Sequence, residues 1–172
     1  ENGQLERRRN YKNGKLDGLW EYFDKNGQLS GRQHYRDGNS VGLWESYYEN
    51  GQLEQQRNYK NRKSEGLWGM FHKNGELKFR GNYKNGKLDG LRETFYLKSD
   101  NNPFVLHGPI NTRKNYKYGK RDGLEEWFRV NGQLERRENY KYGKRDGLEE
   151  WFRVNGQLWV RKHNKKGKMD GL

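Results

Sequence analysis

An internal repeat with a period of about 24 residues runs through almost the whole chain. The turn signal Asn-Gly-x-Leu begins at Asn2, Asn26, Asn50, Asn74, Asn131 and Asn155. The signal Asp/Glu-Gly-Leu begins at Asp17, Glu65, Asp89, Asp122, Asp146 and Asp170, with Val41 in the remaining position. A repeat of this length is one supersecondary unit, which buries apolar surface only by stacking on its neighbours. The period therefore favours a repeat array over an ordinary globule.

Each repeat contains two strand-like segments and two turn signals. In one unit the segments are residues 18–23 and 29–35, and Asn26-Gly27 stands between them. Asn-Gly is typical of a type I′ turn, so we expect that turn here, and residues 13–18 also carry turn chemistry. No helical period is present. We expect an all-β fold, an elongated single-layer antiparallel β-meander of 24-residue hairpin repeats with about 13 strands.

One interruption breaks the period. We expect residues 1–172 to form a single array of about seven hairpin units with an insertion at 97–106, after which the register resumes at His107. Both prolines, Pro103 and Pro109, lie in or beside this insertion. Its apolar run, Phe104, Val105 and Leu106, is a candidate partner-contact loop, since exposed apolar loops mark contact sites. The alternative is that the run folds back over the sheet edge.

Alternation along the strands predicts which side chains share a face. Leu19 and Phe23 are four residues apart, and Leu29 and Tyr35 are six apart, so their columns are expected to form an inner ladder of Leu, Phe and Tyr. The opposite face is then rich in tryptophan. This candidate aromatic face consists of Trp20, Trp44, Trp68, Trp127 and Trp151. It is either a second packing layer or an aromatic binding groove.

Basic residues also recur in columns, and the formal net charge of the chain is +13. The candidate basic ladders are Arg8, Arg32, Arg80, Arg113, Arg137, Arg161, Lys12, Lys60, Lys84, Lys117 and Lys141. A third column, in the turns, includes Lys15 and Lys63. Attraction to a long polyanion would add up over such a ladder. Alternatively, the basic side chains cover aromatic edges and pair with neighbouring acids.

Catalytic patterns do not assemble in this sequence. Residues 81–87 read GxxxxGK, but Leu88 follows where a phosphate-binding loop needs Ser or Thr. The histidines, at positions 34, 72, 107 and 163, have no metal-ligand or triad spacing. The absence of Cys excludes disulfides and leaves the compartment undetermined. We therefore expect no catalytic, metal or cofactor site and predict that the chain is not an enzyme.

The unit DGLWEYFDKNGQLSGRQHYRDG resembles the MORN repeat, and more closely the bacterial-type variant called the YwqK antitoxin family. The resemblance covers the chain outside the region around Pro103 and implies a long, curved, single-layer sheet. It also implies scaffolding or membrane-associated roles. The expected function is a non-catalytic scaffold that binds a protein partner. The alternative is an electrostatic binder of acidic lipid, nucleic acid or another polyanion. Open end strands allow self-association.

Overall fold

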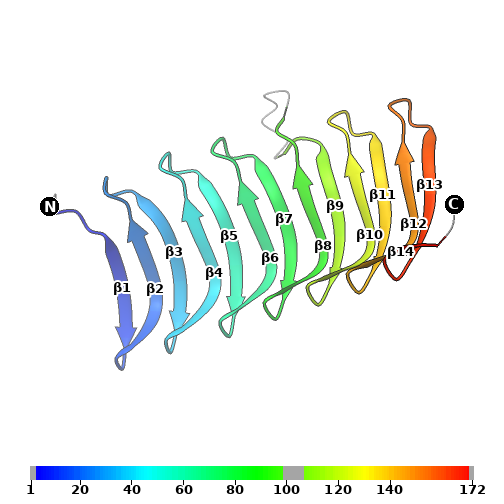
Figure 1. The fold of residues 1–172 in the computed structure, drawn as a ribbon. Coiled ribbons are helices and arrows are strands. Elements are labelled where there is room, and N and C mark those ends of the chain that lie inside the picture. The colour runs from blue at the N-terminus through cyan, green and yellow to red at the C-terminus, as the bar shows by residue number, and fades with distance from the viewer. Residues whose placement is uncertain (1–2, 99–106, 171–172) are drawn as a thin grey trace.

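The computed structural model describes residues 3–98 and 107–170, and they form one antiparallel sheet of 14 strands (Figure 1). Each strand pairs with its neighbours in sequence, from β1 at one edge to β14 at the other. The predicted all-β meander is confirmed, and the described ranges contain no helix. The strands are β1 (Arg7–Lys12), β2 (Lys15–Phe23), β3 (Leu29–Arg36), β4 (Asn39–Tyr47), β5 (Leu53–Lys60), β6 (Lys63–Phe71), β7 (Leu77–Lys84), β8 (Lys87–Phe95), β9 (Ile110–Lys117), β10 (Lys120–Phe128), β11 (Leu134–Lys141), β12 (Lys144–Phe152), β13 (Leu158–Lys165) and β14 (Lys168–Met169).

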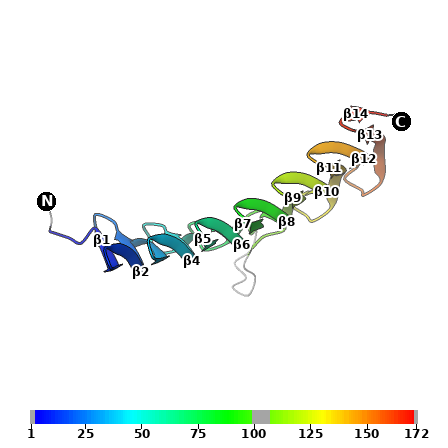
Figure 2. The same ribbon diagram turned by 90° about the horizontal axis from the view of Figure 1, so that it is seen from below.

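The sheet is a single twisted layer with the two chain ends at opposite ends of the array (Figure 2). The structure has one strand more than the 13 expected, and this additional strand, β14, has only two residues. Because every strand pairs only with the preceding and following strand, each hairpin depends on its immediate neighbours.

The connections at one end of the strands are two-residue turns in the left-handed region. In the β1–β2 turn, Asn13 has φ 49° and Gly14 has φ 73°. Two successive positive φ values define a type I′ turn, whose twist matches the strands it joins. Asn, Asp or Gly adopts this conformation easily, which explains the Tyr-Lys-x-Gly signal of the repeat.

The connections at the opposite end differ from the prediction. The expected type I′ turn at Asn26-Gly27 is wrong, because only Gly27 has a positive φ (79°). Gly27 N donates to Asp24 O at 2.9 Å, and Asp24 N donates to Gln28 O at 2.8 Å. This pattern is the longer hairpin loop in which a glycine in the left-handed region follows a type I turn. The Asp24 carboxylate accepts hydrogen bonds from the N–H groups of Asn26 and Gln28 and fixes the loop.

The glycine of Asp/Glu-Gly-Leu lies at a bulge beside an asparagine. Gly123 has φ 104°, and a Cβ there would lie 3.2 Å from the Cβ of Asn115. The Asn115 amide donates to Leu124 O at 2.8 Å across the bulge. Both the backbone angle and the close approach favour glycine at this position.

The tyrosine column does not lie on the face that the sequence predicted for it. The Tyr35 ring lies 5.2 Å from that of Trp20, and the Tyr83 ring lies 5.4 Å from that of Trp68. The tyrosine column therefore shares a face with the tryptophans, here called the tryptophan face. The prediction that grouped Tyr with Leu and Phe was wrong because each bulge inserts residues that shift the alternation between neighbouring strands.

The other face, here called the arginine face, carries the Arg8 column. Arg8 lies over the Phe23 ring at 5.8 Å, and Arg137 lies over the Phe152 ring at 5.7 Å. The leucines on this face do not form a closed hydrophobic core, and Leu67, for example, is 54% exposed. Among the described residues, the buried hydrophobic side chains are Phe79, Phe95 and Tyr140. A single layer leaves both faces in contact with solvent, so Leu is covered only by its neighbours on the same face.

The insertion lies between β8 and β9. Tyr96 N donates to Pro109 O at 2.9 Å, the same bond that Asp24 N makes to Gln28 O in a regular repeat. The hairpin register is thus kept on both sides of the insertion. Phe104, Val105 and Leu106 lie outside the described residues.

Candidate binding surfaces

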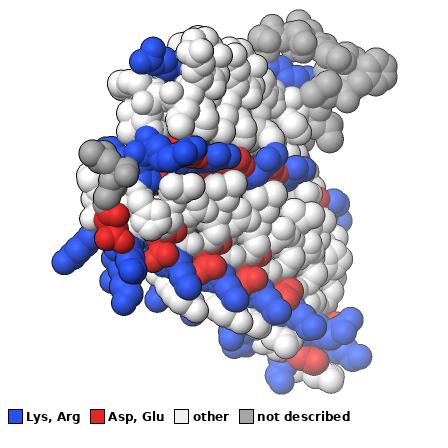
Figure 3. Space-filling view, turned by 90° about the vertical axis from the view of Figure 1, so that its right-hand side faces the viewer, with Lys and Arg blue, Asp and Glu red and all other residues white. Residues whose placement is uncertain are grey.

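An alternating ladder of arginine and glutamate crosses the middle of the arginine face. Glu93 accepts hydrogen bonds from Arg80 at 2.6 Å and from Arg113 at 3.0 Å, although these residues come from the strands on either side of it. Glu150 is held in the same way between Arg137 and Arg161. Arg8 pairs with Glu21 at 3.1 Å, and Arg32 pairs with Glu45. Figure 3 shows such charged side chains gathered in bands that run across the strands.

Every arginine of the candidate basic ladders is therefore paired with a glutamate of a neighbouring strand, although its side chain stays partly exposed. Glu93 and Glu150 are 2% and 1% exposed, so they need these cationic partners to remain charged. Burial raises the pKa of Glu150, but hydrogen bonds from Arg137 and Arg161 outweigh it and hold the pKa below its ordinary value. The arginine ladder is better explained as a structural element than as a polyanion site.

The first half of the tryptophan face, up to β8, is built from aromatic rings and arginines. Arg57 lies 4.0 Å over the Trp68 ring and 5.6 Å from the Tyr83 ring. Arg9 covers the Trp20 ring at 4.5 Å. Trp44 opposes Arg57 in the register of β4 and β5. These contacts favour the packing-layer interpretation for the N-terminal tryptophans.

A groove of about 630 Å³ opens on the tryptophan face across β6–β9. Its wall includes Trp68, Met70, Phe79, Tyr83, Leu88, Arg92, Thr94 and Tyr116. Gly81 stands at the strand position that Arg57 occupies one repeat earlier, and the Phe79 and Leu88 side chains fill the space there, 3.1 and 3.3 Å from where a Cβ would lie. Thr94 stands at the position of Trp127 and Trp151 in later repeats. The small Thr94 thus leaves open a space on this face that a tryptophan occupies in the later repeats.

Both ends of this groove carry polar groups. Arg92 lies 4.8 Å over the Phe79 ring and is only partly buried. At His72, burial and the nearby Lys78 lower the pKa, so the imidazole is neutral at pH 7. Arg92 and Lys78 both line the groove beside its apolar residues, which fits a partner with an apolar group beside a carboxylate.

The second half of the tryptophan face, from β9 onward, is an ionic network. Three buried glutamates, Glu125, Glu138 and Glu149, occupy it. Lys114 and Arg121 pair with Glu125, and Arg145 pairs with Glu138 at 3.2 Å. Their neighbour Arg136 pairs with both Glu138 and Glu149 and lies over the rings of Trp127 and Trp151 at 4.8 and 4.1 Å.

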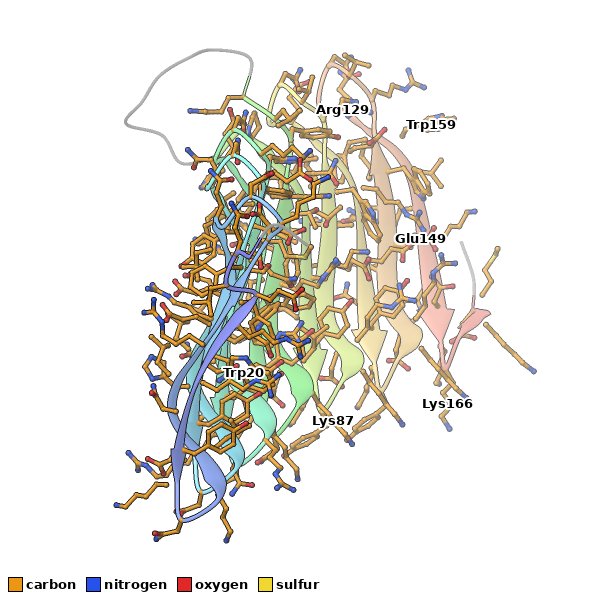
Figure 4. The ribbon with its side chains drawn as sticks, turned by 90° about the vertical axis from the view of Figure 1, so that its left-hand side faces the viewer. Trp20, Lys87, Arg129, Glu149, Trp159 and Lys166 are labelled. Carbon is orange, nitrogen blue, oxygen red and sulfur yellow. The ribbon has the colours of Figure 1, made fainter. Side chains whose placement is uncertain are left out.

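The type I′ turns carry an exposed row of lysines, here called the lysine rim. Two lysines lie directly opposite each other beside nearly every turn. The rim consists of Lys12, Lys15, Lys60, Lys63, Lys84, Lys87, Lys117, Lys120, Lys141, Lys144, Lys165 and Lys168. Figure 4 shows Lys87 at this end of the strands, with Arg129 and Trp159 at the opposite end. Within residues 3–98 and 107–170, no rim lysine has an ion-pair partner within 4.0 Å.

The acids nearest to the rim are already engaged by backbone groups. Asp89 accepts a hydrogen bond from Tyr118 N at 3.0 Å, and Asp122 accepts one from Tyr142 N at 3.1 Å. Glu65 does the same for Asn85 N at 2.8 Å. Each carboxylate therefore fastens the turn of the next hairpin, and the lysines keep their charge without a partner. Of the predicted basic residues, the lysines alone remain available.

Sequence reasoning found the lysine and tryptophan columns but missed two features. It did not identify the place of the groove, whose signal is Thr94 at a position that Trp127 and Trp151 occupy in later repeats. It also missed the burial of the glutamate network, because Glu125 and Glu149 stand at a tryptophan position and Glu138 stands in another column. These residues meet only because the bulges shift the register between neighbouring strands.

Neither a metal site nor a membrane-crossing helix is present in the described part of the chain. No group of three or more His, Asp or Glu side chains there could hold a metal ion. No described helix is long and apolar enough to span a bilayer.

The fold and its surfaces define an open, single-layer β-hairpin repeat protein. The sequence pattern of the MORN repeat variant matches residues 16–37, 40–61, 64–85 and 121–142, about half of the chain. The chain belongs to this family. Its repeats are generally non-enzymatic scaffolds, and they commonly mediate binding to proteins or membranes. A comparison with curated proteins finds no match.

Proposed function

We propose that the chain is a non-catalytic scaffold that binds a protein partner in the groove of the tryptophan face. The groove itself carries this proposal, because it is the place where the repeat leaves an apolar hollow lined by Trp68, Phe79 and Leu88. Its volume of about 630 Å³ accommodates a few side chains of a peptide rather than a folded domain. The partly exposed Arg92 favours a segment that carries a carboxylate beside its apolar residue.

The test fills the groove with a residue that the repeat already uses. Thr94→Trp places a tryptophan where Trp127 and Trp151 stand in later repeats, so the sheet should accept it. Ser46→Trp is the matched control, since Ser46 occupies the same position outside the groove. Peptides selected from a random display library on the unmodified protein should bind Ser46→Trp equally and Thr94→Trp at least about tenfold more weakly. Equal binding by both variants would exclude the groove.

A second candidate function is electrostatic binding of a polyanion along the lysine rim, which the unpaired lysines favour. Acidic phospholipid vesicles and nucleic acid are both candidate ligands. Affinity should fall steeply with salt, because each neutralised lysine releases counterions. Replacing Lys117, Lys120, Lys141 and Lys144 with Gln should reduce that salt dependence. An affinity that does not change with salt would remove this candidate.

Three narrower proposals accompany these functions. The whole chain, residues 1–172, acts as one array of about seven hairpin units, in which the insertion at 97–106 offers a partner-contact loop through Phe104, Val105 and Leu106. The repeat unit is of the bacterial, YwqK-like type, as its sequence resembles. The outer edge of β1, whose residues are all exposed, supports self-association by strand pairing. Analytical ultracentrifugation over a concentration series tests for self-association. A protein that stays monomeric at every concentration would rule this proposal out.

A further inference from the structure

Two exposed tyrosines occupy a turn position that is otherwise taken by Asn, Asp or Lys. Tyr118 and Tyr142 have φ 52° and 51°, and they are 69% and 70% exposed. The equivalent first residues of the other type I′ turns are Asn13, Asp37, Asn61, Asn85 and Lys166. A bulky side chain in the left-handed region is unfavourable, and its ring gains no burial here. Neither folding nor packing therefore explains these two tyrosines.

The surroundings of both rings are strongly basic. Lys117 and Lys120 flank Tyr118, and Lys141 and Lys144 flank Tyr142, all exposed and without an ion-pair partner among the described residues. The Lys117 ammonium lies 5.9 Å from the Tyr118 ring. A hollow of about 370 Å³ beside Tyr142 is lined by Lys141, Lys144, Asp146 and Lys166.

The nearby acids form no ion pair with the rim lysines among the described residues and instead bind backbone groups. Asp89 and Asp122 accept the backbone N–H groups of Tyr118 and Tyr142, and Asp146 accepts that of Lys166 at 3.1 Å. These hydrogen bonds also hold the turns in place, so the rings are carried by a rigid backbone. Consecutive hairpins lie two strands apart, about 10 Å.

We propose that this part of the lysine rim, from the β9–β10 turn to the β13–β14 turn, binds single-stranded nucleic acid. Bases stack on the exposed faces of Tyr118 and Tyr142, and the flanking lysines contact the phosphates. Aromatic platforms set in a basic track are the general means by which proteins hold single strands without reading their sequence. This inference rests on the second candidate function and names its ligand.

The composition of the rim favours a single strand over the alternative polyanions. A membrane site would place aliphatic side chains beside the aromatic rings to enter the lipid, whereas the immediate neighbours of Tyr118 and Tyr142 are lysine and glycine. A duplex keeps its bases stacked on each other, so the tyrosines would gain nothing from it. Only an unpaired strand uses both the rings and the lysines.

The experiment replaces both tyrosines with the residue that the repeat itself uses at this position. Tyr118→Asn/Tyr142→Asn keeps every lysine and relieves the backbone, because asparagine tolerates the left-handed region. Trp159→Asn is the control, since Trp159 is 62% exposed and lies at the opposite end of the strands (Figure 4). Binding is measured by fluorescence anisotropy with a labelled 20-nucleotide oligothymidine, the same length of duplex, and vesicles containing phosphatidylserine.

We expect the single strand to bind more tightly than the duplex. The tyrosine variant should lose at least about tenfold in affinity for it, with an unchanged salt slope, whereas Trp159→Asn should bind normally. Equal single-strand binding by the tyrosine variant would overturn the proposal while leaving the rim as a polyanion site. Binding to vesicles alone would also overturn it and would assign the rim to lipid. If no probe binds, the second candidate function fails as well.

Discussion

At the scale of single residues, this sheet is stabilised by buried charge to an unusual degree. The most completely buried side chains are Glu93, Glu125, Glu138 and Glu150, where a globular core would have Leu or Phe. Each is compensated by cationic groups from neighbouring strands. The ladder is interrupted at Gln56 and Gly69, where both charges are absent together. A ladder can lose a whole pair with little effect, but losing one member leaves a buried charge without a partner.

Glu93→Gln should therefore destabilise the protein by about 1–3 kcal/mol, because Arg80 and Arg113 lose their shared anion. Urea unfolding followed by tryptophan fluorescence measures this difference. Glu49→Gln is the control, since Glu49 is exposed and should change stability by less than about 0.5 kcal/mol. If the two variants have the same stability as the unmodified protein, the ladder is not structural.

The pH dependence of stability follows from Glu150. Its pKa in the folded state lies below the ordinary value of 4.5, because its hydrogen bonds to Arg137 and Arg161 outweigh the effect of burial. A lowered pKa stabilises the fold above the unfolded pKa, and this stabilisation is lost as the pH falls through the folded pKa. Stability should thus be steady above about pH 6 and fall below about pH 4.5. Glu150→Gln should lower stability at pH 7 and flatten the acid fall, and an equally steep fall in this variant would contradict the assignment.

At the scale of elements, the hairpins were predictable but their registers were not. Strand alternation and the turn signals identify the meander, since an Asn-Gly or Asp-Gly pair is a strong local constraint. The type of turn at Asn26 and the face of Tyr35 were predicted wrongly, because a bulge changes the residue count between neighbouring strands. The place of the groove could not be predicted, because it depends on which side chains meet Arg92 and Thr94 across the strands. The lysine rim could be predicted from the sequence, since turns expose the residues that flank them.

The bulge glycine provides a prediction at this scale. Gly147→Ala should destabilise the β12 bulge by more than about 1 kcal/mol, because φ is 110° and the new Cβ would lie 3.1 Å from Asn139. Gly156→Asn should be tolerated within about 0.5 kcal/mol, because φ is 81° and the space around Gly156 is open. Thermal unfolding of the two variants and of the unmodified protein measures these changes in stability. Equal losses would show that the approach to Asn139 is unimportant.

At the scale of the whole molecule, the stability of each hairpin depends on its contacts with neighbouring hairpins, because the sheet is a single layer. Each strand is hydrogen-bonded only to the strands beside it in the sheet, so there is no central core to hold distant repeats together. The same openness leaves both faces and the rim accessible to partners. Charge is divided between these surfaces, with the arginines of the ladder paired to glutamates and the lysines of the rim left exposed.

Tyr83→Ala should loosen the array locally. The Tyr83 ring contacts Trp68 and Arg57, so its removal is expected to destabilise the protein by about 2 kcal/mol. Amide hydrogen exchange should accelerate most in β6–β8 and little in β12–β13, because coupling passes only between neighbours. Uniform acceleration along the chain would contradict this one-dimensional account.

The central claim is that a partner occupies the groove of the tryptophan face. Hydrogen exchange of the protein with and without a selected peptide tests it most directly. The account predicts slower exchange in β6–β9, around Trp68, Phe79 and Arg92, with little change at the rim turns. Protection confined to the rim turns or to the edge strand β1 would contradict it.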